Sequence, residues 1–258
     1  MGLFGKIFEK KICSICGGEI GLLGNRKLED GNMCKSCASK LSPWFSDRRR
    51  STVEQIKQQL SYREMNKSVV ALFNTTRSYG DGMKLLIDEG AGDFTVTRST
   101  DLIKTNPDII SISSVTGFEY DIKEHRTEDR QTDSEGRSVS YNPPRYFFSY
   151  DFEIKIRVNN PYFDEIGFKL NNFSVELNPG FAVPAAQTPD PRNNREYMKY
   201  YDMCEEIKSL LRAPKATPTQ HESTPPKAEA KQIVCPYCGG LNDSNVGGKC
   251  AFCGGNLD

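Results

Sequence analysis

The stretch CSICGGEIGLLGNRKLEDGNMCKSC, residues 13–37, holds two CxxC pairs with 17 residues between them. A second four-cysteine set lies at residues 235–253, with 11 residues between its two pairs. Zinc takes four soft ligands in a tetrahedron, and each CxxC supplies two of them from one tight turn. The spacings therefore predict two structural Zn²⁺ sites per chain, one formed by Cys13, Cys16, Cys34 and Cys37 and the other by Cys235, Cys238, Cys250 and Cys253.

Composition favours a reducing compartment. The 258 residues allow one medium domain plus small modules, and the hydrophobic share of 37% fits a chain that contains metal-built units. No run approaches the roughly 18 apolar residues that span a bilayer, and no secretory signal pattern follows Met1. We therefore expect a cytoplasmic protein, in which the CxxC pairs bind metal rather than form disulfides or a redox pair.

The charge is divided although its sum is zero. Residues 1–68 carry 13 Lys and Arg against 7 Asp and Glu, a balance of +6, whereas residues 69–212 carry 17 against 23, a balance of −6. The field of this mildly basic N-terminal segment, followed by an acidic middle segment, is too weak to indicate nucleic-acid binding by itself.

The residues around the first cysteine set predict a small zinc module at 13–46. A hairpin is expected over 22–33 with Asp30-Gly31 as its turn, and a short helix over 38–45, stopped near Pro43. This order of knuckle, hairpin and helix resembles the treble-clef class of zinc fold.

An amphipathic arm, residues 1–12, precedes the zinc module. Its apolar residues fall at helical spacing, opposite lysines: Leu3, Phe4, Ile7 and Phe8. One interpretation is a short helix on an anionic membrane surface. The other, which we favour, is a hydrophobic arm that packs on the zinc module or on a partner.

A connecting helix is expected over residues 50–68. The pattern Ser51-Thr52-Val53-Glu54 indicates a capping box, and one face is apolar at Val53, Ile56, Leu60, Tyr62, Met65 and Val69. Arg48, Arg49 and Arg50 come just before it. Because cations at a helix start oppose its dipole, helix stability does not explain them. They can contact phosphate or an acidic partner, although a solvated linker is the favoured interpretation.

The middle segment, residues 69–212, is dominated by strand patterns. Residues 145–158 alternate six apolar with polar positions, which predicts a long strand with one wet face. Further strands are expected at 83–87, 94–97, 109–113, 118–122, 166–170 and 173–177. The polar residues 124–144 predict a hairpin loop. A helix over 194–211 has the buried stripe Tyr197, Tyr201, Cys204, Ile207 and Leu211, so Cys204 is a predicted core residue.

About seven antiparallel strands followed by one helix resemble the pleckstrin-homology (PH-like) barrel. The segment DIISISSVTGFEYDI, residues 108–122, is similar to a mid-barrel strand of bacterial PH-like and GRAM-like domains. The start of the chain, CSICG followed by LGNRKL and CKSC, resembles an uncharacterised bacterial family with such a finger and a PH-like domain. The resemblance implies an α+β fold: a mostly antiparallel PH-like barrel with a C-terminal capping helix, flanked by two small four-cysteine zinc modules.

The remaining residues predict a tether and a second zinc module. Residues 213–234 contain four prolines and no apolar periodicity, which indicates a disordered linker. Residues 235–258 look like a prokaryotic zinc ribbon, which should be unfolded without metal.

No catalytic constellation is found. His125 lies in the polar insertion and His221 in the linker, and neither position would hold a general base rigidly. Each predicted zinc has four cysteine ligands, so neither keeps the open position of a catalytic zinc. We therefore predict a non-enzymatic adaptor that binds a protein partner or itself. The alternatives are nucleic-acid binding through Arg48, Arg49 and Arg50, and membrane association through the N-terminal arm.

Overall fold

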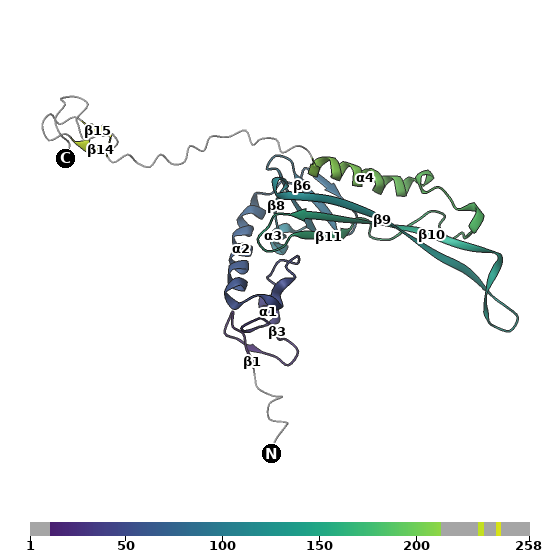
Figure 1. Cartoon of the computed structure of the whole chain (residues 1–258), viewed down its shortest axis with the longest axis horizontal. Helices are drawn as coiled ribbons and strands as arrows, with labels where there is room; N and C mark the ends of the chain where they lie inside the picture. Colours follow the sequence, from purple (N-terminus) through teal and green to yellow (C-terminus); the bar gives the residue numbers. More distant parts are fainter. Residues whose placement is uncertain (1–10, 213–231, 235–240, 244–258) are drawn as a thin grey trace, which may run out of the picture. The chain divides into compact units, whose positions relative to one another are not determined.

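The computed structural model describes residues 11–212, 232–234 and 241–243. The chain divides into two compact units, Met1–Ala213 and Pro214–Asp258. The first unit combines helices with antiparallel sheets (Figure 1), which confirms the α+β class. None of the helices in the described part of the chain has the length and apolar character needed to cross a membrane.

The first unit begins with two small hairpins and a short helix. Strand β1 (Lys11–Ile12) pairs with β2 (Glu19–Ile20), and β3 (Arg26–Lys27) pairs with β4 (Asn32–Met33). Helix α1 (Lys35–Ala38) follows, and a 3-10 turn, η2 (Asp47–Arg50), ends this segment. The hairpin expected over 22–33 is present. The helix expected over 38–45 is not found at that position. The helix present is the earlier and shorter α1, and the chain leaves helical geometry well before Pro43. Residues 11–50 are called the metal module below.

Helix α2 (Val53–Leu72) begins one residue later than the predicted capping box. Its N-cap is Thr52, whose side chain accepts from the Gln55 amide while the Gln55 side chain accepts from the Thr52 amide. The Asp30 carboxylate, in the turn of the second hairpin, accepts from the Val53 amide at 2.7 Å. Of the four backbone amides at the start of α2 that have no acceptor within the helix, three are thereby paired. One of the three is paired with a side chain of the metal module.

The buried face of α2 is not the predicted apolar face. The residues that it buries are Ile56, Gln59, Arg63, Asn66 and Val70, whereas Met65, Val69 and Leu72 are exposed. The predicted face is therefore wrong in the second half of the helix. Polar side chains are buried there because they are paired with groups from a distant loop, which are described with the site below.

The first sheet is an antiparallel meander of four strands in sequence order. Its strands are β5 (Arg77–Tyr79), β6 (Lys84–Asp88), β7 (Asp93–Thr97) and β8 (Ile110–Ser111). A short helix, α3 (Leu102–Thr105), lies between β7 and β8, and a 3-10 turn, η3 (Ile112–Ser114), leads onward. The predicted strand at 109–113 is thus only two residues long.

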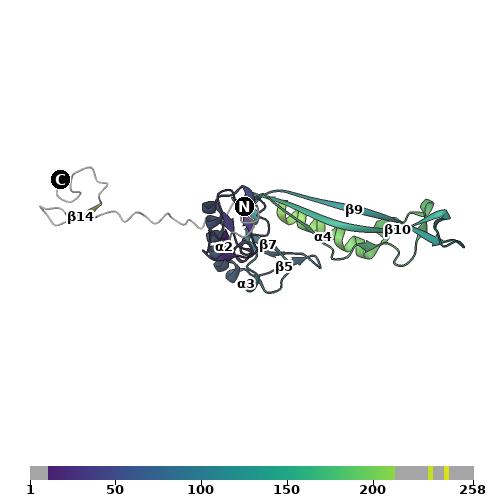
Figure 2. The ribbon, with the colours of Figure 1, turned by 90° about the horizontal axis from the view of Figure 1, so that it is seen from below.

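The second sheet is built around one long strand, β10 (Ser138–Val158). Strand β9 (Val115–Thr132) pairs along one edge of β10, and three shorter strands pair in turn along the other edge: β11 (Glu165–Lys169), β12 (Val175–Glu176) and β13 (Val183–Pro184). Figure 2 shows β9 and β10 side by side along their length, with α4 against them.

The loop predicted over 124–144 is mostly strand. β9 continues to Thr132 and β10 begins at Ser138, so only a short turn remains between them. No residue of the outer part, residues 126–147, is buried, which is why the sequence shows no apolar alternation there. Cross-strand contacts stabilise it instead: the Arg126 guanidinium lies 3.6 Å from the Tyr146 ring centroid, and Arg130 donates to Ser138. We call residues 126–147 the hairpin arm.

Helix α4 (Arg195–Arg212) ends the first unit, after the 3-10 turns η4 (Ala185–Gln187) and η5 (Pro191–Asn193). It buries Tyr197, Tyr200, Cys204, Ile207 and Leu211, so Tyr200 replaces the predicted Tyr201. Both sheets and α4 share one hydrophobic core. No strand of the first sheet pairs with a strand of the second within residues 11–212, so these strands do not form a closed barrel. Residues 77–212 are called the β body.

The second unit is described only at two short strands. β14 (Gln232–Val234) pairs antiparallel with β15 (Leu241–Asp243), with Val234 opposite Leu241. The predicted arm, except for Lys11 and Ile12, lies outside the described residues. So do most of the linker and of the zinc ribbon, including Cys235, Cys238, Cys250 and Cys253.

Candidate metal centre

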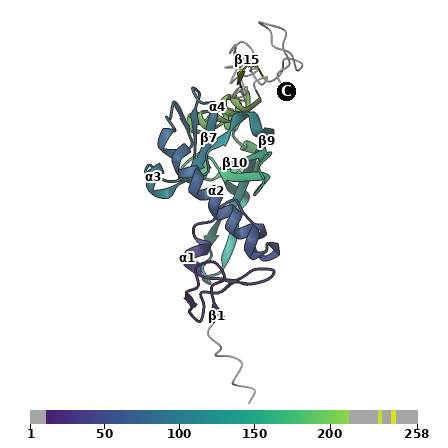
Figure 3. The same cartoon turned by 90° about the vertical axis from the view of Figure 1, so that its left-hand side faces the viewer.

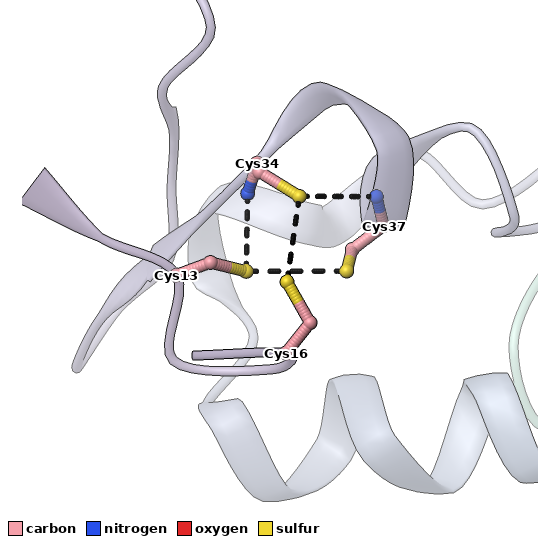
Figure 4. A group of neighbouring side chains, drawn as sticks. All are labelled: Cys13, Cys16, Cys34 and Cys37. Atoms are coloured by element: carbon pink, nitrogen blue, oxygen red, sulfur yellow. Dashed lines mark hydrogen bonds between the residues drawn. The ribbon is translucent and has the colours of Figure 1, made fainter. Parts of the chain in front are cut away.

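The first CxxC pair sits in the turn that joins β1 to β2. The Cys13 amide donates to the Gly18 carbonyl at 2.8 Å, and the Gly17 amide donates to the Cys13 carbonyl at 2.8 Å. Gly17 has φ +72°, a left-handed conformation that glycine adopts without strain. The turn closes on itself and presents both cysteine side chains on one side (Figure 4).

The second CxxC pair sits where β4 enters α1. Cys34 is the N-cap of α1, and its sulfur accepts from the Cys37 amide at 3.4 Å. The Cys34 amide in turn donates to the Cys13 sulfur at 3.3 Å. The start of the helix thus connects both pairs through N–H···S contacts, which stabilise thiolate sulfur.

The four sulfur atoms form a compact group (Figure 4). The Sγ atoms of Cys13 and Cys37 are 3.9 Å apart, those of Cys16 and Cys34 are 3.8 Å apart, and all four lie within 4.8 Å of one another. A tetrahedral zinc with Zn–S bonds of about 2.3 Å separates its sulfurs by about 3.8 Å. The cluster therefore has the dimensions and the donor set of a zinc site. It is the one such metal-ligand cluster in the part of the chain that the structure describes.

The surroundings of Cys13 favour its thiolate form, which is the form that binds a metal cation. Burial raises the pKa of Cys13, but the backbone amides of Cys16, Cys34 and Ile15 outweigh burial and lower it to about 6. Burial, together with the neighbouring sulfurs, raises the pKa of Cys37. One thiolate therefore forms readily, and a bound cation is what would allow the others to lose their protons.

Cys204, the one cysteine outside the two four-cysteine sets, is a core residue, as the sequence predicts. Its side chain is fully buried on α4, and burial raises its pKa to about 12. It contributes to packing and belongs to no metal-ligand cluster among the described residues.

The three arginines before α2 do not form one patch. Arg48 donates to the Lys27 carbonyl of β3 at 2.7 Å, and Arg50 donates to the Asp47 carboxylate. Arg49 is exposed. The arginines belong to their own 3-10 turn rather than to the first turn of α2.

His125 is on β9, half-exposed, with its Nε2 atom 3.2 Å from the Asp151 carboxylate. Asp151 also accepts from Ser174, Asn171 and Lys169. The histidine thus lies at the edge of a structural cluster on the sheet. His221 lies outside the described residues.

A buried polar network that the sequence does not reveal fastens the metal module to the β body. Arg63 on α2 pairs with Asp108 at 2.7 Å, and Ser42, which follows α1, donates to the same carboxylate at 2.7 Å. Arg63 also donates to the carbonyls of Lys40 and Asn106. Burial raises the pKa of Asp108, while Arg63 and Ser42 oppose that rise.

Asn66 and Asn106 complete the network. The Asn66 amide donates to the Asn106 side chain at 2.8 Å and to the Pro107 carbonyl at 2.7 Å. The Asn106 side chain donates to the Arg63 carbonyl on α2 at 2.8 Å. Asn106 has φ 44°, a left-handed conformation that asparagine tolerates better than most residues. One signal could have revealed the network: polar residues at helical spacing, Arg63 and Asn66, where an apolar face was expected.

Apolar contacts reinforce the same junction. Trp44 packs against the core of the β body, whereas the next residue, Phe45, packs against the core of the metal module together with Ile56 of α2. Helix α2 runs between the metal module and the first sheet (Figure 3). The metal centre is therefore built into a continuous unit.

A family model, described as a domain of unknown function (DUF4428), matches residues 11–59. The match spans all four clustered cysteines, η2 and the first turns of α2, and it leaves the β body and the second unit unmatched. Comparison with curated proteins gave no significant match. Comparison with solved structures gave none either. The family match thus lies on the segment that carries the metal centre.

Proposed function

We propose that the protein is a non-catalytic, zinc-stabilised adaptor or scaffold that binds a protein partner. The observation that supports this most directly is the cluster of Cys13, Cys16, Cys34 and Cys37. A zinc held by four cysteines has no open position for water or substrate, so its role is to hold the surrounding chain in shape. The closed polar junction to the β body fits the same role.

In this proposal the β body is PH-like. The supporting feature is the order of its elements: a four-stranded meander, a second meander of β9, β10 and β11, and one terminal helix over the shared core. A binding surface on such a body is supplied by loops and strand edges, and no enzymatic step is assigned to it.

The second unit is proposed to be a zinc ribbon that carries a second Zn²⁺. The support is local: Cys235 and Cys238 lie in the stretch between the paired strands β14 and β15, where a ribbon places its first two ligands. On a tether, such a module would act as a second binding head and raise avidity without enlarging the first interface.

The adaptor proposal is tested by capture and by molar mass in solution. The full chain should retain a partner in stoichiometric amount from a cell lysate, or form a defined oligomer by light scattering. The Cys34→Ser/Cys37→Ser variant, whose metal module cannot close, should lose that association, while Cys204→Ser should keep it. A monomer that retains no stoichiometric partner would contradict the proposal.

Nucleic-acid binding is a second candidate, supported by Arg48 and Arg49, which line one hollow together with Arg26 and Lys27. A gel shift with single-stranded and duplex DNA tests it, since binding through several phosphates weakens steeply with salt. Absence of a shift at low salt would exclude this candidate.

A further inference from the structure

The loop between β2 and β3 places two leucines in solvent. The Gly24 amide donates to the Gly21 carbonyl at 2.9 Å, which closes a tight turn with Leu22 and Leu23 at its centre. Their exposed fractions are 87% and 90%. Two adjacent, almost fully exposed leucines at the tip of a turn contribute nothing to the core of the metal module, so packing does not explain them.

A basic hollow of ≈ 670 Å³ lies next to this turn. Its described lining residues come from β3, its flanking residues and η2: Asn25, Arg26, Lys27, Leu28, Glu29, Arg48 and Arg49. Four of these side chains are cationic and one is anionic. The hollow and the turn are joined by Arg26, whose guanidinium donates to the Leu23 carbonyl at 3.4 Å and to the Asn25 carbonyl at 3.3 Å.

None of the four cations has a carboxylate partner among the described residues. Within residues 11–212, Arg26 and Arg48 donate only to backbone carbonyls, and no ion pair engages Lys27 or Arg49. Burial and then the positive charges of Arg49 and Arg26 lower the pKa of Arg48. The guanidinium groups therefore repel one another, and an anion in the hollow would relieve that repulsion.

We propose that the turn and the hollow together form a contact for an anionic phospholipid surface: Leu22 and Leu23 enter the acyl boundary while Arg26, Lys27, Arg48 and Arg49 bind headgroup phosphates. Apolar side chains beside a cationic cluster are the combination that holds a protein at an anionic bilayer. Nucleic acid fits less well, because the described residues lining the hollow include no aromatic side chain for stacking, and a phosphate backbone has no use for the leucines.

Vesicle flotation of the zinc-loaded full chain tests this directly. The protein should float with vesicles that contain phosphatidylglycerol and stay behind with pure phosphatidylcholine, and its binding should weaken with salt. Lys27→Gln/Arg49→Gln changes two exposed side chains, so the fold should be kept. Because each cation near an anionic surface contributes about a fivefold factor, this variant should bind about 25-fold more weakly.

The leucines are tested separately. Leu22→Ser/Leu23→Ser should weaken binding about 100-fold or more at any salt concentration, because it removes buried apolar area rather than charge. Matched controls are Leu72→Ser, which changes an equally exposed leucine on α2, and Arg98→Gln, which changes an exposed cation of the β body. Both should bind like the wild type.

Three results would overturn the proposal. The first is equal flotation with neutral and anionic vesicles. The second is unchanged flotation of the leucine variant while Leu3→Ser/Phe4→Ser abolishes it, which would assign the contact to the N-terminal arm. The third is a salt-dependent gel shift with single-stranded DNA in the absence of flotation. In that case the two-cation variant would lose the gel shift and the leucine variant would keep it, and neither would float with vesicles.

Discussion

Arg63 and Asp108 form a buried ion pair at the junction between metal module and β body. Their charged groups are 2.7 Å apart, and the exposed fractions of the two side chains are 9% and 0%. Removing one partner of a buried pair leaves an uncompensated charge, which typically costs about 3–5 kcal/mol. Arg63→Met should therefore lower the free energy of unfolding by about that amount in urea titrations.

Lys67→Met is the matched control for Arg63→Met. Lys67 pairs with Glu64 on the same helix, but both side chains are mostly exposed. Exposed helical pairs contribute about 0.3–0.5 kcal/mol, so this variant should unfold almost like the wild type. A similar, small loss in both variants would show that the buried network does not hold the junction.

The Asp151 carboxylate makes the stability of the β body depend on pH in the acid range. Burial raises the pKa of its carboxyl, but Ser174, Lys169 and Asn171 outweigh burial and lower it below the usual 3.8. Its stabilisation is therefore complete above about pH 4 and is lost as the pH falls through the lowered value. Asp151→Asn should lower the free energy of unfolding at neutral pH by about 1.5–3 kcal/mol.

The difference between wild type and Asp151→Asn should shrink as the pH falls below 3.8, because the wild-type carboxyl then becomes protonated as well. Denaturant titrations from pH 7 to pH 2 measure it. Asp121→Asn, which removes an exposed carboxylate on the same second sheet, is the control and should unfold like the wild type. A constant difference at every pH would mean that charge is not the source of the stabilisation.

At the residue scale, the sequence predicts contacts that depend on local spacing and misses those that do not. The four clustered cysteines of the metal module are predictable because a CxxC turn is a local pattern with a defined chemistry. Arg63 could not be assigned to the buried face of α2, because its partner lies 45 residues away. A prediction from apolar residues alone places Met65 on the buried face of α2, whereas the structure exposes Met65 and buries Asn66.

Among the elements, β9 and β10 differ most from what the sequence predicts. Their inner halves alternate apolar with polar residues, which predicts strands. The hairpin arm buries nothing, and most of it, residues 126–144, falls in the segment for which the sequence predicts a loop. Alternation of apolar and polar residues marks a strand only where one face of that strand is buried. The arm depends on cross-strand pairing, which a single strand's sequence does not record.

The arm should therefore be separable from the core. Replacing residues 130–144 by Asn-Gly joins Asp129 to Arg145, which already face each other in the ladder, through a two-residue turn. No buried residue is removed, so thermal and urea unfolding should change by no more than about 1 kcal/mol.

Phe152→Ala, a fully buried position on the same strand, is the contrast to the shortened hairpin and should cost about 3–5 kcal/mol. Broad, non-cooperative unfolding of the shortened chain would mean that the arm is part of the core rather than an addition to it.

On the scale of the first unit as a whole, the metal module and the β body should unfold together. Trp44, the only tryptophan, packs against the β body although it lies in the segment that follows α1. Its fluorescence therefore reports the junction. Chelation of zinc should shift Trp44 emission and lower the urea midpoint of the β-sheet circular dichroism signal in one shared transition. Two separate transitions, with Trp44 unchanged by chelation, would mean that the β body is independent of the metal.

The zinc content of purified full-length variants, measured by plasma mass spectrometry, tests the assignment of the metal sites. The proposal of two four-cysteine sites predicts two zinc ions per wild-type chain and one in Cys16→Ser/Cys34→Ser, because that variant removes half of the ligands of the N-terminal cluster. Cys204→Ser, which alters a core residue, should keep two. Equal zinc content in the wild type and in Cys16→Ser/Cys34→Ser would contradict the assignment of a structural zinc to this cluster.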